Sequence, residues 1–405
     1  MAIVIKRKYF NLILYTLGII ILGCILYFFV KPYIFNSQEN KILDDGNQLA
    51  SDSKSADNAT DQNQINSNPV YTVDHIATPV QVKALYMSSW IAGVPTRREK
   101  IVKIADDTEI NSIVIDIKDA TGRVAFKTDD KLINEIGSTE NRVKDMKSFI
   151  DDLHKKDIYV IGRISVFQDP YLAKVKPEWA ITRKSDGKVW KDRKGLSFMD
   201  PAKPEVREYV VRIAKASYAL GFDEINFDYI RYPSDGDLKN IDYHLKEGVK
   251  RADNIEFFFK NLSLDMKKET NIPISGDLFG LTTEVEPGDD MGIGQVWEKA
   301  LPYFDFLCPM IYPSHYPAGQ YGFANPAAHP KEVIDHALNG AINKTVMMNL
   351  PLSKIRPWLQ DFDMGAKYTA DMVRAQIDSS ENNGIISWMF WDPKNVYTPS
   401  AFYND

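Results

Sequence analysis

The stretch from Gly221 to Gly236 carries residues whose types and spacing could do chemistry. Between Glu224 and Ile230 apolar residues alternate with polar ones, which is the period of a β-strand whose two faces meet different surroundings. The strand ends in a carboxylate, Asp228, and runs into a loop that contains Arg231 and Tyr232. Charge is therefore expected where a strand gives way to a loop, the position of catalytic groups in α/β-barrel enzymes.

Other predicted strands also end in acids, and aromatic residues lie among them. The acids are Asp119, Asp169, Asp228, Asp277, Asp361 and Asp392, and the aromatic residues are Tyr232, Tyr312, Trp358 and Trp391. Sugars offer hydroxyls to carboxylates and apolar C–H faces to aromatic rings, so this rim predicts a carbohydrate site. Expected substrate contacts also include Arg231, His315 and Gln360.

Glycoside hydrolysis needs two carboxylates that flank the bond, one of them protonated. Asp228 and Asp277 follow the fourth and fifth predicted strands, where side chains can approach to the roughly 5 to 5.5 Å of a retaining pair. We predict Asp228 as the nucleophile and Asp277 as the acid/base, with Asp361 as a third candidate. For each of these acids the alternative is a structural role as a helix cap or loop bracket.

The elements that would position these residues alternate between strand and helix. The predicted strands are residues 82–90, 112–118, 158–167, 224–230, 272–275, 304–311, 354–360 and 384–391. Stretches with helical periodicity lie between them, whereas residues 171–200 have no clear period and are expected to form a long loop. Eight such units predict an α/β fold, a closed parallel (β/α)8 TIM barrel.

Composition and motifs exclude several other classes of protein. The chain is 44% apolar and 26% charged with a net charge of −6, and no basic stripe indicates nucleic acid as a partner. Phosphate-binding loops of the forms G-x-x-x-x-G-K-[ST] and G-x-G-x-x-G are missing, so no nucleotide is expected. The six histidines are scattered without ligand spacing, so we predict neither a metal nor another cofactor.

The first 35 residues have the pattern of a membrane anchor. Leu12 to Val30 is an apolar run of 19 residues that follows Lys6, Arg7 and Lys8. Such a run can cross a bilayer as a helix, and the preceding positive charge favours a cytoplasmic N-terminus. We therefore expect a single-pass protein of the cell membrane with its main domain on the extracytoplasmic side. The alternative is a lipoprotein anchored at Cys24, because Ile21-Leu-Gly-Cys24 is similar to a lipobox.

Residues 36–80 are rich in Asn, Ser, Asp and Gln with few apolar residues. Such a segment cannot offset the entropy cost of ordering, so it is predicted to be a disordered linker. The barrel domain is then expected to occupy residues 81–405.

Several motifs resemble a bacterial family of glycoside hydrolases of unknown specificity with a TIM-barrel domain. The matching segments are Val114 to Asp119, Phe167 to Pro170, Gly221 to Asp235, Asp277 to Gly280, Cys308 to Tyr316 and Arg356 to Phe362. The resemblance implies a carbohydrate-active barrel from about Val82 to the C-terminus.

Residues 222–233 are also similar to the fourth strand of family 18 chitinases. The chitinase strand has an acidic residue at the position of Asn226 and its catalytic glutamate at the position of Ile230. Substrate-assisted chitinase chemistry is therefore not implied. Two hypotheses follow: a glycoside hydrolase acting on a cell-wall or exopolysaccharide glycan, or a tethered glycan-binding or wall-organising protein that does not hydrolyse.

Overall fold

The structure, a computed structural model, describes residues 73–268 and 271–404. The predicted membrane anchor at residues 12–30 and most of the predicted linker lie outside the described residues. Within the described ranges no helix is both long and apolar enough to cross a membrane. Asp74–Asp405 forms one compact unit, which contains the predicted barrel.

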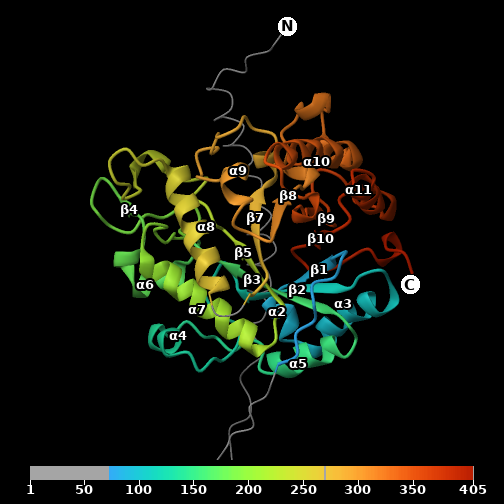
Figure 1. Cartoon of the computed structure of the whole chain (residues 1–405), viewed down its shortest axis with the longest axis horizontal. Coiled ribbons are helices and arrows are strands. Elements are labelled where there is room, and N and C mark those ends of the chain that lie inside the picture. Colours follow the sequence, from blue (N-terminus) through green and yellow to red (C-terminus); the bar gives the residue numbers. More distant parts are fainter. Residues whose placement is uncertain (1–72, 269–270, 405) are drawn as a thin grey trace, which may run out of the picture. The chain divides into compact units, whose positions relative to one another are not determined.

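Eight parallel strands of this unit close into a barrel in the order β1-β10-β9-β8-β7-β5-β3-β2 (Figure 1). These strands are β1 (Lys83–Met87), β2 (Ser112–Lys118), β3 (Tyr159–Ser165), β5 (Glu224–Asp228), β7 (Ile274–Phe279), β8 (Phe306–Met310), β9 (Trp358–Gln360) and β10 (Trp388–Trp391). Each overlaps a predicted strand, so the (β/α)8 prediction is confirmed. Most strands are shorter than predicted, because apolar residues continue into loops that pack on the barrel.

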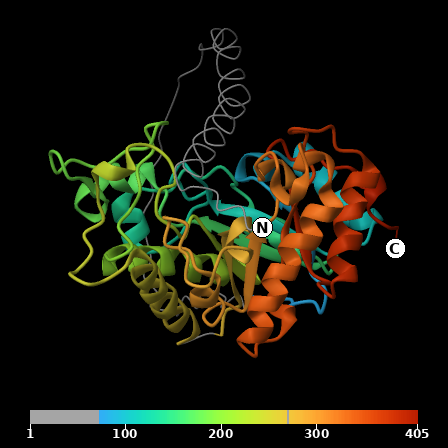
Figure 2. The same ribbon diagram turned by 90° about the horizontal axis from the view of Figure 1, so that it is seen from above.

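Helices cover the outside of the barrel (Figures 1 and 2). They are α2 (Ser89–Ala92), α3 (Pro95–Asp107), α4 (Lys131–Ile136), α5 (Met146–His154), α6 (Pro170–Val175), α7 (Pro204–Leu220), α8 (Arg251–Lys267), α9 (Trp297–Ala300), α10 (Pro330–Met347) and α11 (Ala370–Asn382). Short 3-10 turns of three or four residues lie in the loops between them. Helix α7 starts at Pro204, which suits a first helical turn, and ends before Gly221, whose φ of 130° suits glycine.

The stretch at residues 171–200, expected to be a loop, contains α6 and a short strand. That strand, β4 (Thr182–Arg183), pairs antiparallel with β6 (Ile241–Asp242) from the loop after β5. The loops that follow β3 and β5 are thereby joined to one another, and Figure 1 shows β4 at one edge of the unit.

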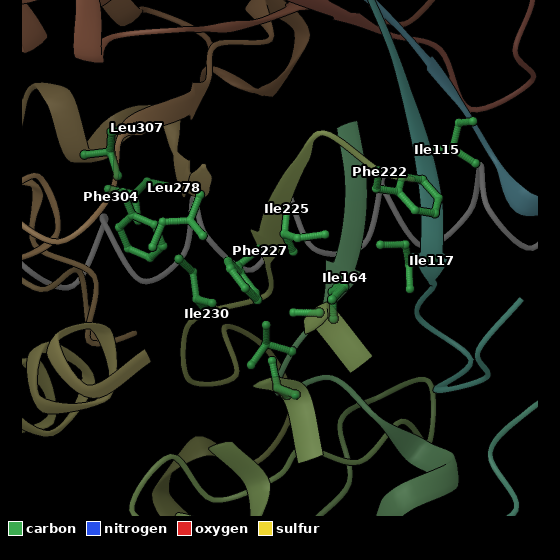
Figure 3. Close-up of a cluster of buried hydrophobic side chains, with 14 of the residues drawn as sticks. Ile115, Ile117, Ile164, Phe222, Ile225, Phe227, Ile230, Leu278, Phe304 and Leu307 are labelled. Carbon is green, nitrogen blue, oxygen red and sulfur yellow. The ribbon is translucent and has the colours of Figure 1, made fainter. Parts of the chain in front are cut away.

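Strand alternation sorts the side chains into two layers. Outward residues such as Ile225 and Phe227 pack with helix residues in one apolar cluster, part of which is drawn in Figure 3. Inward residues include Asn226 and Asp228, which face the barrel interior with a smaller apolar cluster around Tyr86. The alternation seen in the sequence thus marks an apolar outer face and a polar inner face.

The last residues of the predicted linker bind to the barrel. Ile76 N donates to Asp223 Oδ1 at 2.8 Å, and Thr78 Oγ1 lies 2.9 Å from the Tyr159 hydroxyl. Asp223 and Tyr159 stand at the amino-terminal ends of β5 and β3, and Ile76 packs on the interior cluster. The compact unit therefore begins near Asp74 rather than at residue 81.

Candidate active site

Asp228 ends β5 and faces the barrel interior, with 5% of its surface exposed. Arg163 on the neighbouring strand β3 donates from Nη2 to Asp228 Oδ2, and the backbone N–H of Tyr229 donates to Oδ1 at 2.5 Å. Tyr229 has a φ of 52°, an uncommon conformation for a residue with a side chain. The ion pair and the turned backbone hold Asp228 as a fixed carboxylate at the strand end.

Asp277 lies on β7, the strand next to β5, and only 1% of its surface is exposed. Its Oδ1 accepts hydrogen bonds of 2.8 Å from Asn226 Nδ2 and from Trp358 Nε1. Its Oδ2 has no hydrogen-bond partner among the described residues. Burial, followed by the negative charge of Asp228, raises the pKa of Asp277 to about 8. At neutral pH Asp277 therefore carries a proton, which the unpartnered oxygen is free to donate.

The two acids lie level with each other on adjacent strands. Phe227 pairs with Gly276 in the β5–β7 register, so the next inward positions are Asp228 and Asp277. Neighbouring strands lie about 4.8 Å apart, which places such a pair near the carboxylate spacing of retaining glycosidases. The guanidinium of Arg163 reaches both acids, since its Nε lies 3.8 Å from Asp277 Oδ2.

Arg163 also connects to a third acid that the sequence analysis missed. Its Nη1 donates to Asp116 Oδ1 at 2.7 Å, and the Tyr86 hydroxyl donates to Asp116 Oδ2 at 2.6 Å. Burial is the main cause that raises the pKa of Asp116, and the charge of Arg163 opposes it. Asp116 and Arg163 interrupt apolar strands at inward positions, and this signal could have identified them from the sequence.

Aromatic rings form a wall beside these polar groups. The Tyr312 ring lies 5.6 Å from the Trp391 ring and 5.8 Å from the Phe362 ring, and Tyr86 lies 6.4 Å from Trp391. The His315 ring lies 5.2 Å from Tyr312. Desolvation lowers the pKa of His315 to about 4, so its imidazole is neutral at neutral pH. Tyr312, Trp391 and His315, predicted as substrate contacts, are thus brought together.

Three other predicted substrate contacts have structural partners instead. Trp358 is 2% exposed and supports Asp277, so it is not an open sugar platform. Gln360 is fully buried and accepts from the Ser314 backbone at 3.1 Å. Tyr232 is 1% exposed, and its hydroxyl accepts from Asn254 Nδ2 at 2.7 Å. None of these three side chains is left open to a ligand.

Two predicted acids bracket the C-terminal loop. Both oxygens of Asp361 accept hydrogen bonds from Thr398, at 2.7 and 2.8 Å. Asp392 Oδ1 accepts from the backbone of Lys394 and Val396. Burial raises the pKa of each of these aspartates to about 6. The structural alternative therefore accounts for the contacts of Asp361, the third catalytic candidate.

Asp119 occupies the rim rather than the centre. Its Oδ2 accepts from Arg142 Nη1 at 2.6 Å and from Trp90 Nε1 at 3.2 Å. Trp90 is 44% exposed, and the Arg142 guanidinium lies 4.1 Å from its ring centroid. Asp169, also on the predicted rim, forms a buried ion pair of 2.7 Å with Lys118 and caps α6.

No group of three or more His, Cys, Asp or Glu side chains within residues 73–268 and 271–404 is arranged to hold a metal ion. The acids are also well covered, and the partly exposed side chains in this region include Arg163, Tyr229 and Trp391.

An eight-stranded barrel with paired acids at the carboxyl ends of its strands is the architecture of many glycoside hydrolases. Residues 84–397 match the family described as "Putative glycosyl hydrolase domain". This match covers more than half of the chain, so the chain belongs to that family.

Solved structures with a similar fold include an α-L-fucosidase isoenzyme from Paenibacillus thiaminolyticus, at 14% identity and a TM-score of 0.53, covering 79% of this chain and 48% of that one. A hypothetical protein from Ruminiclostridium thermocellum is 31% identical over 51% of this chain and 98% of its own, with a TM-score of 0.44. The glycoside hydrolase domain of PelA from Pseudomonas aeruginosa is 11% identical over 81% of this chain and 98% of its own, also at 0.44. A search of curated proteins found no match.

Proposed function

We propose that this chain is a membrane-anchored extracytoplasmic glycoside hydrolase that cleaves a cell-wall or exopolysaccharide glycan with retention of configuration. The observation that carries the proposal is the pair formed by Asp228 and Asp277. One is ion-paired with Arg163, and the other has a pKa raised to about 8. A carboxylate held by a cation, level with a carboxyl group whose pKa is raised, is the arrangement that a double-displacement glycosidase requires.

In the first step Asp228 attacks the anomeric carbon while Asp277 Oδ2 protonates the leaving oxygen. In the second step Asp277, now a carboxylate, takes a proton from water, and that water releases the sugar from Asp228. Asn226 and Trp358 hold the other oxygen of Asp277, so the proton is confined to Oδ2. The rings of Tyr312 and Trp391 offer apolar faces to the sugar.

The anchor is proposed from the sequence. The apolar run at residues 12–30 and the basic residues before it support a single-pass orientation with the barrel outside. Membrane fractionation with external protease would test this arrangement. Release of the chain into the soluble fraction, or full protection of the barrel from protease in intact cells, would contradict this arrangement. Labelling with a palmitate analogue that depends on Cys24 would favour the lipoprotein alternative.

The test of the activity is hydrolysis of a panel of bacterial polysaccharides, followed by measurement of new reducing ends. Asp228→Asn should abolish release, and Asp361→Asn, the same chemical change at another strand end, should not. Equal activity in the wild type and Asp228→Asn would exclude the proposed nucleophile.

The burial of both acids favours a second candidate function, a glycan-binding protein that does not hydrolyse. Exposures of 5% and 1% leave little of either carboxylate open in this arrangement. This candidate predicts saturable binding of a glycan without any product, in the wild type as in Asp228→Asn.

A further inference from the structure

Arg231 is a buried cation without an acidic partner. It is 9% exposed, and no carboxylate of the described chain lies within ion-pair distance of it. Its Nη1 donates to the Tyr232 carbonyl at 3.0 Å and to Ser234 Oγ at 3.4 Å, and both of these acceptors are neutral. Burying an unpaired charge is costly, so such a residue points to a ligand that supplies the opposite charge.

Two aromatic rings hold this guanidinium beside the candidate active site. Its central carbon lies 5.2 Å from the Tyr229 ring centroid and 4.5 Å from that of Phe279. Tyr229 directly follows Asp228, and Phe279 lies two residues after Asp277. The cation is therefore held between the chain segments that follow the two proposed catalytic acids.

The nearest acids are already engaged or too distant to neutralise Arg231. Asp228, Asp192 and Asp235 act on it electrostatically, but beyond ion-pair distance. Asp228 is paired with Arg163, and Asp192 Oδ1 accepts from two backbone N–H groups of its own loop. Burial is the main cause that lowers the pKa of Arg231.

The adjoining surface is basic. Residues 174–203 carry nine Lys or Arg against four Asp or Glu, although the chain as a whole is acidic. Lys184, Lys188 and Lys191 in this segment are exposed. The segment contacts the loop that holds Arg231, because Trp190 Nε1 donates to the Asp237 carbonyl at 3.1 Å. Positive charge on this side would attract an anionic polymer.

We infer that Arg231 binds an anionic group on the glycan, so that the substrate class is an acidic polysaccharide. The inference rests on the proposed function for its placement at a glycan site. The planar guanidinium offers paired donors that fit a carboxylate or a phosphate oxygen pair, and its two rings keep it oriented.

The test measures binding by the full chain in detergent, with Asp228→Asn as background so that no glycan is consumed. The probes are polygalacturonate, alginate and hyaluronan, each compared with its carboxyl-reduced neutral form, and poly(glycerol phosphate) as the phosphate arm. We expect at least one carboxylate polymer to bind about tenfold tighter than its reduced form, or the phosphate polymer to bind with similar dependence on Arg231.

Arg231→Gln should remove this preference, and Arg231→Lys should restore part of it. Arg251→Gln is the matched control, because it removes the same charge outside the site. Arg251 pairs with Asp290 at 3.5 Å. Thermal unfolding of each variant separates lost binding from lost fold. The inference is overturned if no acidic polymer is preferred, or if a folded Arg231→Gln variant keeps the preference. The readout is a ratio of binding affinities and does not require turnover. A preference for acidic polymers without hydrolysis would support the inference and contradict the proposed activity, and hydrolysis without such a preference would do the opposite.

Discussion

Trp358 on β9 donates its indole N–H at 2.8 Å to Asp277 Oδ1 on β7, two strands away in the barrel. The sequence offered this tryptophan as a platform for a sugar ring. Its position shows that it supports the proposed proton donor, since the bond leaves Oδ2 as the free oxygen.

Trp358→Phe keeps an aromatic ring at this position but removes the N–H donor. The hydrogen bond lowers the pKa of Asp277 against burial, so its loss should raise that pKa further. We expect the basic limb of the kcat/KM profile to move to higher pH and kcat to fall about tenfold or more, because Asp277 is less well oriented. An unchanged pH profile would mean that the contact is only packing.

The activity should depend on pH through Asp277. Its pKa of about 8 means that the acid form is present below pH 8 and is lost above it. The rate should therefore fall as the pH rises through about 8, and the measurement is kcat/KM between pH 5 and 10. A substrate whose leaving group needs no protonation should lose this basic limb in its first step. If the basic limb persists with such a substrate, the limb belongs to a group other than Asp277.

Asp228→Asn should lower turnover by about a thousandfold or more, because the nucleophile is removed. Asp361→Asn should leave kcat within about threefold, since Asp361 bonds to Thr398 and not to the central cluster. Initial rates on the same glycan check both. A large loss in Asp361→Asn with an unchanged melting temperature would return Asp361 to the catalytic set.

A buried ion pair closes the lower part of the barrel. Arg356 and Glu224 are both fully buried, 2.8 Å apart, and Ser275 Oγ donates to the same glutamate at 2.6 Å. Arg356→Met would leave Glu224 without its partner and should lower the free energy of unfolding by about 3–5 kcal/mol. Denaturant titration measures this. Adding Glu224→Gln to Arg356→Met should recover part of the lost stability. An Arg356→Met variant as stable as the wild type would contradict a stabilising role for this ion pair.

The N-terminal segment should stabilise the barrel through Asp223. This carboxylate accepts from the backbone of Ile76 and Val160 at 2.8 Å each and lies 3.0 Å from His154 Nε2. Asp223→Ala should cost about 1–3 kcal/mol, because buried donors lose their acceptor. Truncation at residue 81 should lower the melting temperature relative to truncation at residue 73.

Burial alone would raise the pKa of Asp223, but His154 and His75, whose Nδ1 lies 3.5 Å from Oδ1, lower it below its ordinary value. Its stabilising contribution is therefore present above the ordinary pKa of aspartate and is lost as the pH falls through the depressed value. Equal melting temperatures for the two fragments between pH 5 and 7 would contradict a role for residues 74–80.

The sequence by itself determined the barrel and the principal acids. Regular alternation of strand and helix fixes the (β/α)8 order, and the period of two from Glu224 to Asp228 fixes which side chains face inward, because both follow from local backbone geometry. Asp228 and Asp277 could be paired from sequence for the same reason, since consecutive strands of a barrel are neighbours.

Only the tertiary structure decided what each of the other candidates does. Whether Trp358 faces a sugar or supports Asp277, and whether Asp361 bonds to Thr398, depends on contacts between residues far apart in the chain. The same is true of Arg163, which joins Asp116 to Asp228 across three strands, and of Arg231, whose lack of an acidic partner is visible only once its neighbours are in place. Local periodicity reports which face a residue occupies, but its partners and its charge state are set by the groups that folding brings around it.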